Sequence, residues 1–263
     1  MPNSEHKGTR FLPWVFLAGG LTLYGLGAAR GLNILDSGEF LGVAATLGVA
    51  HPTGYPLYAL LGQLATLFPA GDQAFLINLV SAAAGAGAAF FMAAAAAELT
   101  ATWKNASARA AAVVAAGAVT LAGRTLWSVA TLAEVYALNA CCWAALLWAA
   151  ARLRRRGGVR DLLLGALLAG LSLANHVTVA LFLPAAALIA WPGRERARAL
   201  APAVPATVAV FVAALSVNLY VPLRASRHPI FNWNDPSTAG SALAHFSGFQ
   251  YQGNFWEEGL AGV

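Results

Sequence analysis

Long apolar segments alternate with short polar ones along most of the chain. Most apolar segments are close to 20 residues, the length at which a helix crosses a bilayer core of about 30 Å. The pattern therefore predicts an all-α fold, a polytopic transmembrane helical bundle. The expected membrane segments are residues 11–29, 74–97, 110–127, 138–151, 161–190 and 200–221.

The composition agrees with a membrane protein. Of the 263 residues, 59% are hydrophobic and 10% are charged, whereas soluble domains carry about 25% charged residues. The net charge of +5 would suggest a nucleic-acid partner in a soluble protein. Here the arginines lie in short segments between apolar runs, where they set membrane topology. The expected partner is the lipid bilayer, with no nucleic acid, and the adjacent Cys141 and Cys142 are expected to pack inside a helix.

The positions of Lys and Arg predict the topology, because these residues collect on the cytoplasmic side. Four segments of the chain are rich in Lys and Arg. All four face the cytoplasm only if residues 161–190 cross the membrane twice, as two short helices with Asn175-His176 at the outer turn. Residues 55–68 must then dip into the outer leaflet without crossing. We expect about seven crossings and a cytoplasmic N-terminus. The four segments are the N-terminal tail, Lys104 with Arg109, residues 152–160, and residues 194–198, which hold twelve of the sixteen Lys and Arg.

This topology places the unexplained polar groups on one face. We divide the chain into a transmembrane module (1–221), whose outer loop (30–73) carries acids, and an extracytoplasmic segment (222–263). The segment is expected to be the start of a truncated remainder. The groups on or near the outer face are Asp36, Glu39, His51, Glu134, His176, Arg224 and Asp235.

Asp36 and Glu39 are three residues apart, so a helix would present both from one face. Paired carboxylates can serve as a general base and an electrostatic or metal ligand. The alternative is helix capping, with Asp36 as the N-cap and Glu39 in a capping-box-like position. His51, in the turn sequence His-Pro-Thr-Gly-Tyr-Pro, is expected to bind a phosphate or a metal, or to anchor at the head groups. A divalent cation stays open, and nothing in the sequence requires one.

Glu134 lies inside apolar sequence, and a lone acid there indicates function. The alternative places it at the lipid head groups at a helix end. Tyr136 and Asn139 are expected to orient it. Asn175-His176 either contributes to the site or closes the helix turn. Arg224 is expected to hold a lipid phosphate bidentately or to extend to the head groups.

Six motifs in order resemble a known family. Two positions depart from the usual pattern of that family: this chain has Thr53 where a second proline is usual and Asn234 where a glycine is usual. The family is the bacterial group of unknown-function membrane proteins related to the eukaryotic transmembrane O-mannosyltransferase of plexin-type domains, within the GT-C glycosyltransferase superfamily. The motifs are Asp36-Ser37-Gly38-Glu39-Phe40, His51-Pro52-Thr53-Gly54-Tyr55-Pro56-Leu57-Tyr58, Asn78-Leu79 with Ser81, Glu134-Val135-Tyr136-Ala137-Leu138-Asn139, Gly170-Leu171-Ser172 with Asn175-His176, and Asn232-Trp233-Asn234-Asp235-Pro236.

The resemblance implies a GT-C-like bundle in the bacterial inner membrane that transfers a sugar, with mannose as one candidate. The donor would be a polyprenyl-phosphate sugar and the acceptor a hydroxyl of a protein or glycan on the extracytoplasmic face. Asp36 would be the base, with Glu39 and Glu134 completing the catalytic set. Substrate would be bound by His51, Tyr55, Tyr136, Asn175, His176, Arg224, Trp233 and Asp235.

The alternative function is a non-catalytic transporter, flippase or scaffold subunit. A transporter would place polar residues along a path through the membrane midplane. The acids of this chain cluster toward one face, and its apolar segments are mainly alanine and leucine at their centres. This distribution favours an enzyme that acts at the outer face.

Overall fold

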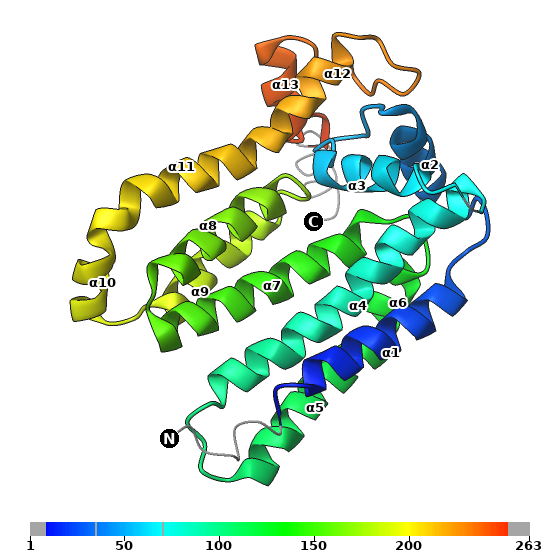
Figure 1. The fold of residues 1–263 in the computed structure, drawn as a ribbon. Helices are drawn as coiled ribbons and strands as arrows, with labels where there is room; N and C mark the ends of the chain where they lie inside the picture. Colours follow the sequence, from blue (N-terminus) through cyan, green and yellow to red (C-terminus); the bar gives the residue numbers. More distant parts are fainter. Residues whose placement is uncertain (1–8, 35, 70, 252–263) are drawn as a thin grey trace, which may run out of the picture.

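A computed structural model describes residues 9–34, 36–69 and 71–251, and within them the regular structure is helical (Figure 1). The expected all-α fold is therefore confirmed for the described residues. Short 3-10 turns, Ala201–Ala203 and Ser216–Leu219, join the last helices of the membrane region. The α-helices are α1 (Leu12–Gly27), α2 (Ser37–Thr46), α3 (Pro56–Thr66), α4 (Gln73–Leu99), α5 (Ala106–Ala122), α6 (Arg124–Ala130), α7 (Val135–Arg156), α8 (Val159–Leu173), α9 (Val179–Ala190), α10 (Arg194–Leu200), α11 (Val204–Leu215), α12 (Tyr220–Ala225) and α13 (Ala239–Phe246).

Helices α4 and α7 form the centre of the bundle. Helix α4 packs against α7, α1 and α5, and α7 packs also against α8 and α9. The buried face of α4 is mainly alanine and glycine, and small side chains let helix backbones approach closely. At Gly85 a Cβ atom would lie 2.6 Å from Ala130 Cβ and 2.9 Å from the Tyr24 ring. The small residues of α4 therefore serve close helix packing.

Three helical stretches are long and apolar enough to cross a membrane, namely Gln73–Leu99, Val135–Arg156 and Arg194–Ala225. The bent pair α5 and α6 would make a fourth. These stretches support an integral membrane protein. Helices α1 and α9 are apolar but shorter, with 16 and 12 residues. The expectation of about seven crossings is thus not confirmed by helix length.

Two expected segments differ from the structure. Residues 110–127 do not form one straight helix, because the chain bends by 56° between α5 and α6. Gly123 sits at the break with an extended ψ of 118°, which interrupts the helical hydrogen-bond ladder. The basic residues 194–198 do not form a loop. They lie in α10, the first turn of the long helical stretch that ends at Ala225.

The expected helix pair within 161–190 is present. Helices α8 and α9 are separated by Ala174–Thr178, so Asn175 and His176 lie at their junction. Helix α3, with 11 residues, covers most of the segment expected not to cross. Whether it dips into a membrane stays a prediction.

The two ends of the bundle differ in charge. The end of α7 at Arg156 lies with the end of α4 and the start of α5, and Arg196 of α10 donates to the carbonyls of Arg154 and Arg155. At the opposite end, α2 and α3 lie across the start of α4 and α7 (Figure 1). The arginines of α7 and α10 therefore gather at the end of the bundle opposite α2 and α3, and the membrane side of that end stays a prediction.

The described C-terminal part folds back on the loop that follows α2. Val49 pairs with Asn232 in a parallel bridge, the Val49 N–H donates to the Phe231 carbonyl (2.7 Å), and the Trp233 N–H donates to the Val49 carbonyl (3.2 Å). The Tyr220 hydroxyl donates to the Gly48 carbonyl (2.8 Å). These contacts hold residues 220–236 over the loop that carries His51.

Candidate active site

Glu39 and His51 form the centre of the candidate site. Glu39 lies in the first turn of α2, and His51 follows α2 in the turn that leads to α3. One carboxylate oxygen of Glu39 accepts from the His51 backbone N–H at 2.6 Å, and the other lies 3.0 Å from Nδ1 of the ring. Both oxygens of Glu39 are therefore engaged by a single residue.

The hydrogen bonds around His51 favour its doubly protonated form. The Tyr55 hydroxyl donates to the Pro52 carbonyl (3.0 Å), so it accepts from His51 Nε2, which lies 3.2 Å away. Nδ1 donates to the Glu39 carboxylate. Burial lowers the pKa of His51, but the hydrogen bond and charge of Glu39, with the charges of Asp36 and Glu134, outweigh it and raise the pKa above its ordinary value. The hydrogen bonds and the raised pKa thus favour a positive charge on His51 beside the acids.

Asp36 stands at the N-cap position of α2, but its side chain makes no capping bond. Glu39 contacts His51 rather than the N-cap backbone, so the capping-box alternative is not formed. The Asp36 side chain is exposed, and its charge acts on both His51 and Glu134. Asp36 is therefore the acid of the cluster that a substrate can reach most readily.

Glu134 precedes α7 and is 2% exposed. Its backbone N–H donates to the Ser81 hydroxyl and its carbonyl accepts from that hydroxyl, each at 3.2 Å. Its Oε2 has no hydrogen-bond partner among the described residues. Burial, followed by the charge of Asp36, raises the pKa of Glu134 to about 7, although His51 acts in the opposite direction. Glu134 is thus a buried acid whose pKa lies well above that of an ordinary carboxyl group.

His176 has the opposite protonation pattern to His51. The Thr178 backbone N–H donates to His176 Nδ1 (3.2 Å), and the Thr178 hydroxyl lies 2.9 Å from the same atom. The Asn139 side-chain amide donates to that hydroxyl (3.1 Å), which leaves the hydroxyl proton for Nδ1. Burial and then the charge of His51 lower the pKa of His176. His176 is thus neutral, with its proton on Nε2.

Asn139 does not orient Glu134 as expected, because its amide contacts Thr178 and so positions His176. Tyr136 also lies beside His176, with 5.7 Å between ring centroids, and Tyr55 lies 5.4 Å from the same ring. The two tyrosines therefore flank His176. The structure draws Asn139 and Tyr136 to His176 because the α8–α9 junction packs against α7.

Three further predicted site residues lie at different distances from the two histidines, namely Asn175, Trp233 and Asp235. Asn175 is 1% exposed and donates to the Val135 carbonyl (3.3 Å), which ties the α8–α9 junction to the start of α7. Trp233 lies 5.9 Å from the His51 ring, edge on, and is 44% exposed. Asp235 lies farther along the same turn and accepts from Asn232 (2.9 Å). Trp233 is thus placed at the edge of the cluster, whereas the contact of Asp235 is local.

Arg224 is placed on backbone rather than beside the acids. Its Nε donates to the Leu47 carbonyl (2.7 Å) and its Nη2 approaches the Thr46 carbonyl (3.4 Å). These are the carbonyls that end α2, and a cation there also complements the helix dipole. Arg224 therefore holds the end of the helix whose other end carries Asp36.

No group of three His, Cys, Asp or Glu side chains within residues 9–34, 36–69 and 71–251 is arranged to hold a metal ion. Glu39 and His51 form two hydrogen bonds with each other, and His51 Nε2 lies 3.2 Å from the Tyr55 hydroxyl. In the described geometry, Glu39 and His51 are therefore partners of each other.

Residues 36–198 match the family model described as the protein O-mannosyl-transferase TMEM260 N-terminal domain. The match begins at Asp36 and covers more than half of the chain. The chain belongs to this family. A curated relative, the protein O-mannosyl-transferase TMEM260 of Mus musculus, is 31% identical over 226 residues, which cover 82% of the chain. The chain spans about a third (31%) of the length of that relative. No solved structure matches the chain.

The family match divides the candidate site. Asp36, Glu39, His51, Glu134 and His176 lie within the matched TMEM260 N-terminal domain, whereas Arg224, Trp233 and Asp235 lie beyond its last residue. The acids and both histidines of the cluster thus belong to the domain that defines the family.

Thr178 and His245 were not predicted from the sequence. Thr178 follows the Asn-His pair by two residues, a spacing that could have indicated a side-chain contact with His176. His245 is 2% exposed, lies in α13 and faces Gly54, whose Cβ would be 3.3 Å from Nε2. Burial lowers its pKa to about 4, so it is neutral. A lone histidine in a short amphipathic stretch offers no signal that could have placed it there.

Proposed function

We propose that the chain is the membrane module of a glycosyltransferase that transfers mannose from a polyprenyl-phosphate donor to an acceptor hydroxyl. The proposal includes a GT-C-like bundle of about seven crossings and an active face on the extracytoplasmic side. It rests on the family match and on the printed name of the mouse relative. The observation that carries it is the cluster of three acids and two histidines at the end of the bundle opposite the arginines of α7 and α10.

In the proposed reaction, Asp36 accepts the proton of the acceptor hydroxyl. The acceptor oxygen forms a bond to the anomeric carbon of the sugar, the bond from that carbon to the phosphate oxygen breaks, and polyprenyl phosphate leaves with the electron pair. Asp36 suits the role because it is exposed and its carboxylate makes no capping bond. The engaged oxygens of Glu39 suit it to holding His51 in its cationic form.

The two histidines suit the leaving phosphate. The His51 cation stabilises negative charge that develops on the phosphate as the glycosidic bond breaks. His176 offers its Nε2 proton as a neutral donor, because Thr178 occupies Nδ1. Glu134, with a pKa raised to about 7 by burial and by Asp36, is proposed to position the sugar or the acceptor.

The test compares two matched Asp→Asn substitutions in proteoliposomes containing the purified chain. The probes are polyprenyl-phosphate [³H]mannose and a peptide rich in Ser and Thr. Asp36→Asn should lower transfer by about 100-fold or more, the range of general base catalysis. Asp72→Asn is the control, because Asp72 is an exposed N-cap of α4 and asparagine caps equally well.

Equal transfer by the wild-type chain and Asp36→Asn would contradict the base assignment. Neither transfer nor donor hydrolysis by the wild-type chain, with intact binding of the donor lipid, would favour a non-catalytic scaffold.

The orientation has its own test. In a Cys141→Ala, Cys142→Ala background, Asn33→Cys probes the acidic end of the bundle and Ser107→Cys probes the basic end, since both positions are exposed. A membrane-impermeant maleimide should label Asn33→Cys in intact cells and Ser107→Cys only after permeabilisation. The reverse pattern would overturn the extracytoplasmic active face.

A further inference from the structure

The basic end of the bundle contains a cavity of about 590 Å³ between α1, α4, α5 and α7. Five arginines line it, although they come from three places far apart in the sequence. Arg10 precedes α1, Arg109 lies in α5, and the others lie in the last two turns of α7. The lining arginines are Arg10, Arg109, Arg152, Arg155 and Arg156. Topology alone requires arginines at this end of the bundle, but it does not require them to converge on one cavity.

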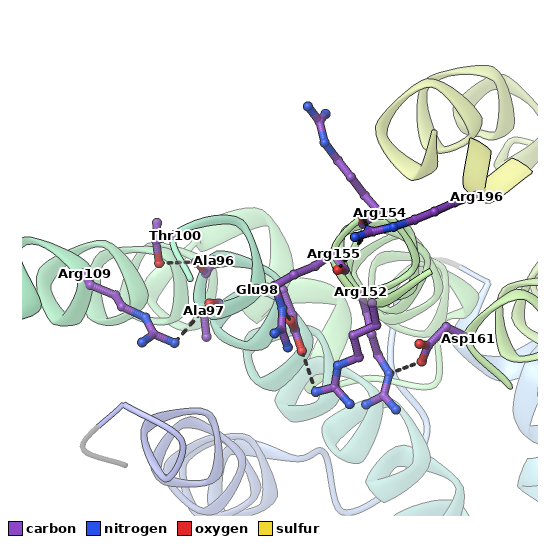
Figure 2. A network of polar contacts seen from close by, with 11 residues as sticks. Ala96, Ala97, Glu98, Thr100, Arg109, Arg152, Arg154, Arg155, Asp161 and Arg196 are labelled. Carbon is purple, nitrogen blue, oxygen red and sulfur yellow. Dashed lines mark hydrogen bonds and ion pairs between the residues drawn. The ribbon is translucent and has the colours of Figure 1, made fainter. Parts of the chain in front are cut away.

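The described carboxylates pair with three of these five arginines. Glu98 is the lining carboxylate among the described residues, and it accepts from Arg155 and from Arg156 (3.2 Å). Asp161, outside the lining, pairs with Arg152. Figure 2 shows these pairs side by side at the ends of α4 and α7. Among the described lining residues, five guanidinium groups thus accompany one carboxylate, a set of donors that suits an anion.

Part of the cavity is set into the fold. Arg109 is 8% exposed and its guanidinium donates to the Ala97 carbonyl at the end of α4 (3.4 Å). The Glu98 side chain is 11% exposed. A guanidinium is a planar donor that matches phosphate oxygens bidentately. Arg109 is thus buried and Arg152 partly buried, whereas Arg10, Arg155 and Arg156 are exposed, and together they offer guanidinium groups to a phosphate.

The other wall of the cavity is aromatic. Trp14 and Phe90 lie 4.8 Å apart, and the Arg152 guanidinium lies 5.3 Å from the Trp148 ring. Trp14 is 60% exposed on the outer surface of α1, and tryptophan favours the membrane–water interface. A ligand in this cavity would meet charge on one side and an apolar surface on the other.

We propose that this cavity binds the headgroup phosphate of an anionic glycerophospholipid, with the acyl chains running along Trp14 and Phe90. The aromatic wall, open to the membrane side of α1, favours a lipid over a free phosphate ion. The site lies at the opposite end of the bundle from the proposed active site. The inference does not depend on the proposed function.

Native mass spectrometry of the purified chain in a neutral detergent tests the proposal. The probes are phosphatidylglycerol and phosphatidylcholine with identical acyl chains. Phosphatidylglycerol should bind more tightly, and Arg155→Gln should weaken its binding by about tenfold, the loss of one charge-assisted hydrogen bond. Glu98 keeps Arg156 as a partner in this variant.

Arg154→Gln is the matched control. This substitution removes the same charge from the neighbouring position of α7. Arg154 does not line the cavity, and its side chain points away from Glu98 and Arg152 in Figure 2. Its phosphatidylglycerol affinity should equal that of the wild type. Arg10→Gln is a second test variant, because Arg10 is exposed and lies outside the helices, so its substitution should weaken binding without unfolding the chain.

Three results would overturn the proposal. Equal binding of the two lipids would exclude recognition of an anionic headgroup. An equal loss in Arg154→Gln and Arg155→Gln would assign the effect to net charge. Displacement of phosphatidylglycerol by millimolar inorganic phosphate would indicate a site for the free ion rather than for a lipid.

Discussion

The Glu39 carboxylate accepts both the backbone N–H and the ring Nδ1–H of His51, at 2.6 and 3.0 Å. This pair closes the loop between α2 and α3 and keeps a positive charge between the acids of the candidate site. The side chains of the two residues are 17% and 14% exposed, so solvent screens their attraction only in part. Replacing either partner should therefore affect both stability and the local charge.

We expect Glu39→Gln to destabilise the fold most at acidic pH. The raised pKa of His51 means that the pair contributes its full stability below the unfolded value of about 6.5 and loses it as pH rises through the folded value. The loss should be about 2 kcal/mol near pH 5.5 and smaller at pH 8.5. Thermal unfolding in detergent at the two pH values measures it, with Glu195→Gln, an exposed acid, as control. A loss independent of pH would contradict the charged pair.

We expect Glu134→Gln to stabilise the fold at alkaline pH. The pKa of Glu134 rises from 4.5 to about 7 in the folded chain, so ionisation costs stability increasingly from pH 4.5 and the cost levels off above pH 7. Glutamine resembles the neutral acid. The gain should be of the order of 2 kcal/mol at pH 8 and vanish near pH 4.5.

Denaturant unfolding of the two proteins across this pH range tests the sign. The exposed Glu195→Gln again serves as control, because its substitution should change stability little at any pH. A variant less stable than the wild type at pH 8 would show that the Glu134 carboxylate has a stabilising ionic partner.

The helices could be predicted from the sequence because they depend on local composition. The apolar runs located α1, α4, α7, α8 and α9, and the requirement that basic residues share one side predicted the break at Asn175 and His176. The bend at Gly123 was missed, although Gly123-Arg124-Thr125 interrupts the apolar sequence of residues 110–127. Their composition does not record the extended ψ that breaks the helix.

The candidate site was only partly predictable, because its contacts join residues that are far apart in the chain. Asp36, Glu39 and Glu134 stood out as acids in apolar surroundings. His51 was also named, but its pairing with Glu39 was not. The contacts of Ser81 with Glu134 across 53 residues and of Arg224 with Leu47 across 177 residues were not predicted either. The charge of Arg224 suggested a phosphate ligand, whereas its position relative to α2 follows only from the packing of the C-terminal segment.

We expect Arg224→Met to lower stability rather than to change donor affinity alone. Its guanidinium holds the Leu47 carbonyl at 2.7 Å, and a hydrogen bond to a charged group contributes about 1.5–3 kcal/mol. Arg227→Met, a nearby exposed arginine, should have little effect. Thermal unfolding and donor KM should be measured together. A raised KM for the donor with unchanged stability would indicate that Arg224 binds the lipid phosphate.

We expect Thr178→Val to release His176 from its single tautomer. The Thr178 hydroxyl donates to Nδ1 and accepts from Asn139, so the wild-type ring should carry its proton on Nε2. Valine keeps the shape but removes the hydroxyl, and only the backbone N–H of residue 178 then remains at Nδ1. ¹⁵N NMR of histidine-labelled protein should show one neutral tautomer in the wild type and a mixture in the variant.

Thr178→Ser retains the hydroxyl and should restore the wild-type spectrum, which separates the hydrogen bond from packing. Under the proposed function, Thr178→Val should also reduce transfer by about tenfold, the cost of one misplaced hydrogen bond, while Thr178→Ser stays close to the wild type. A single Nε2–H tautomer in Thr178→Val would show that the backbone N–H alone positions His176. The hydroxyl and Asn139 would then hold the α8–α9 junction against α7 without controlling the proton on the ring.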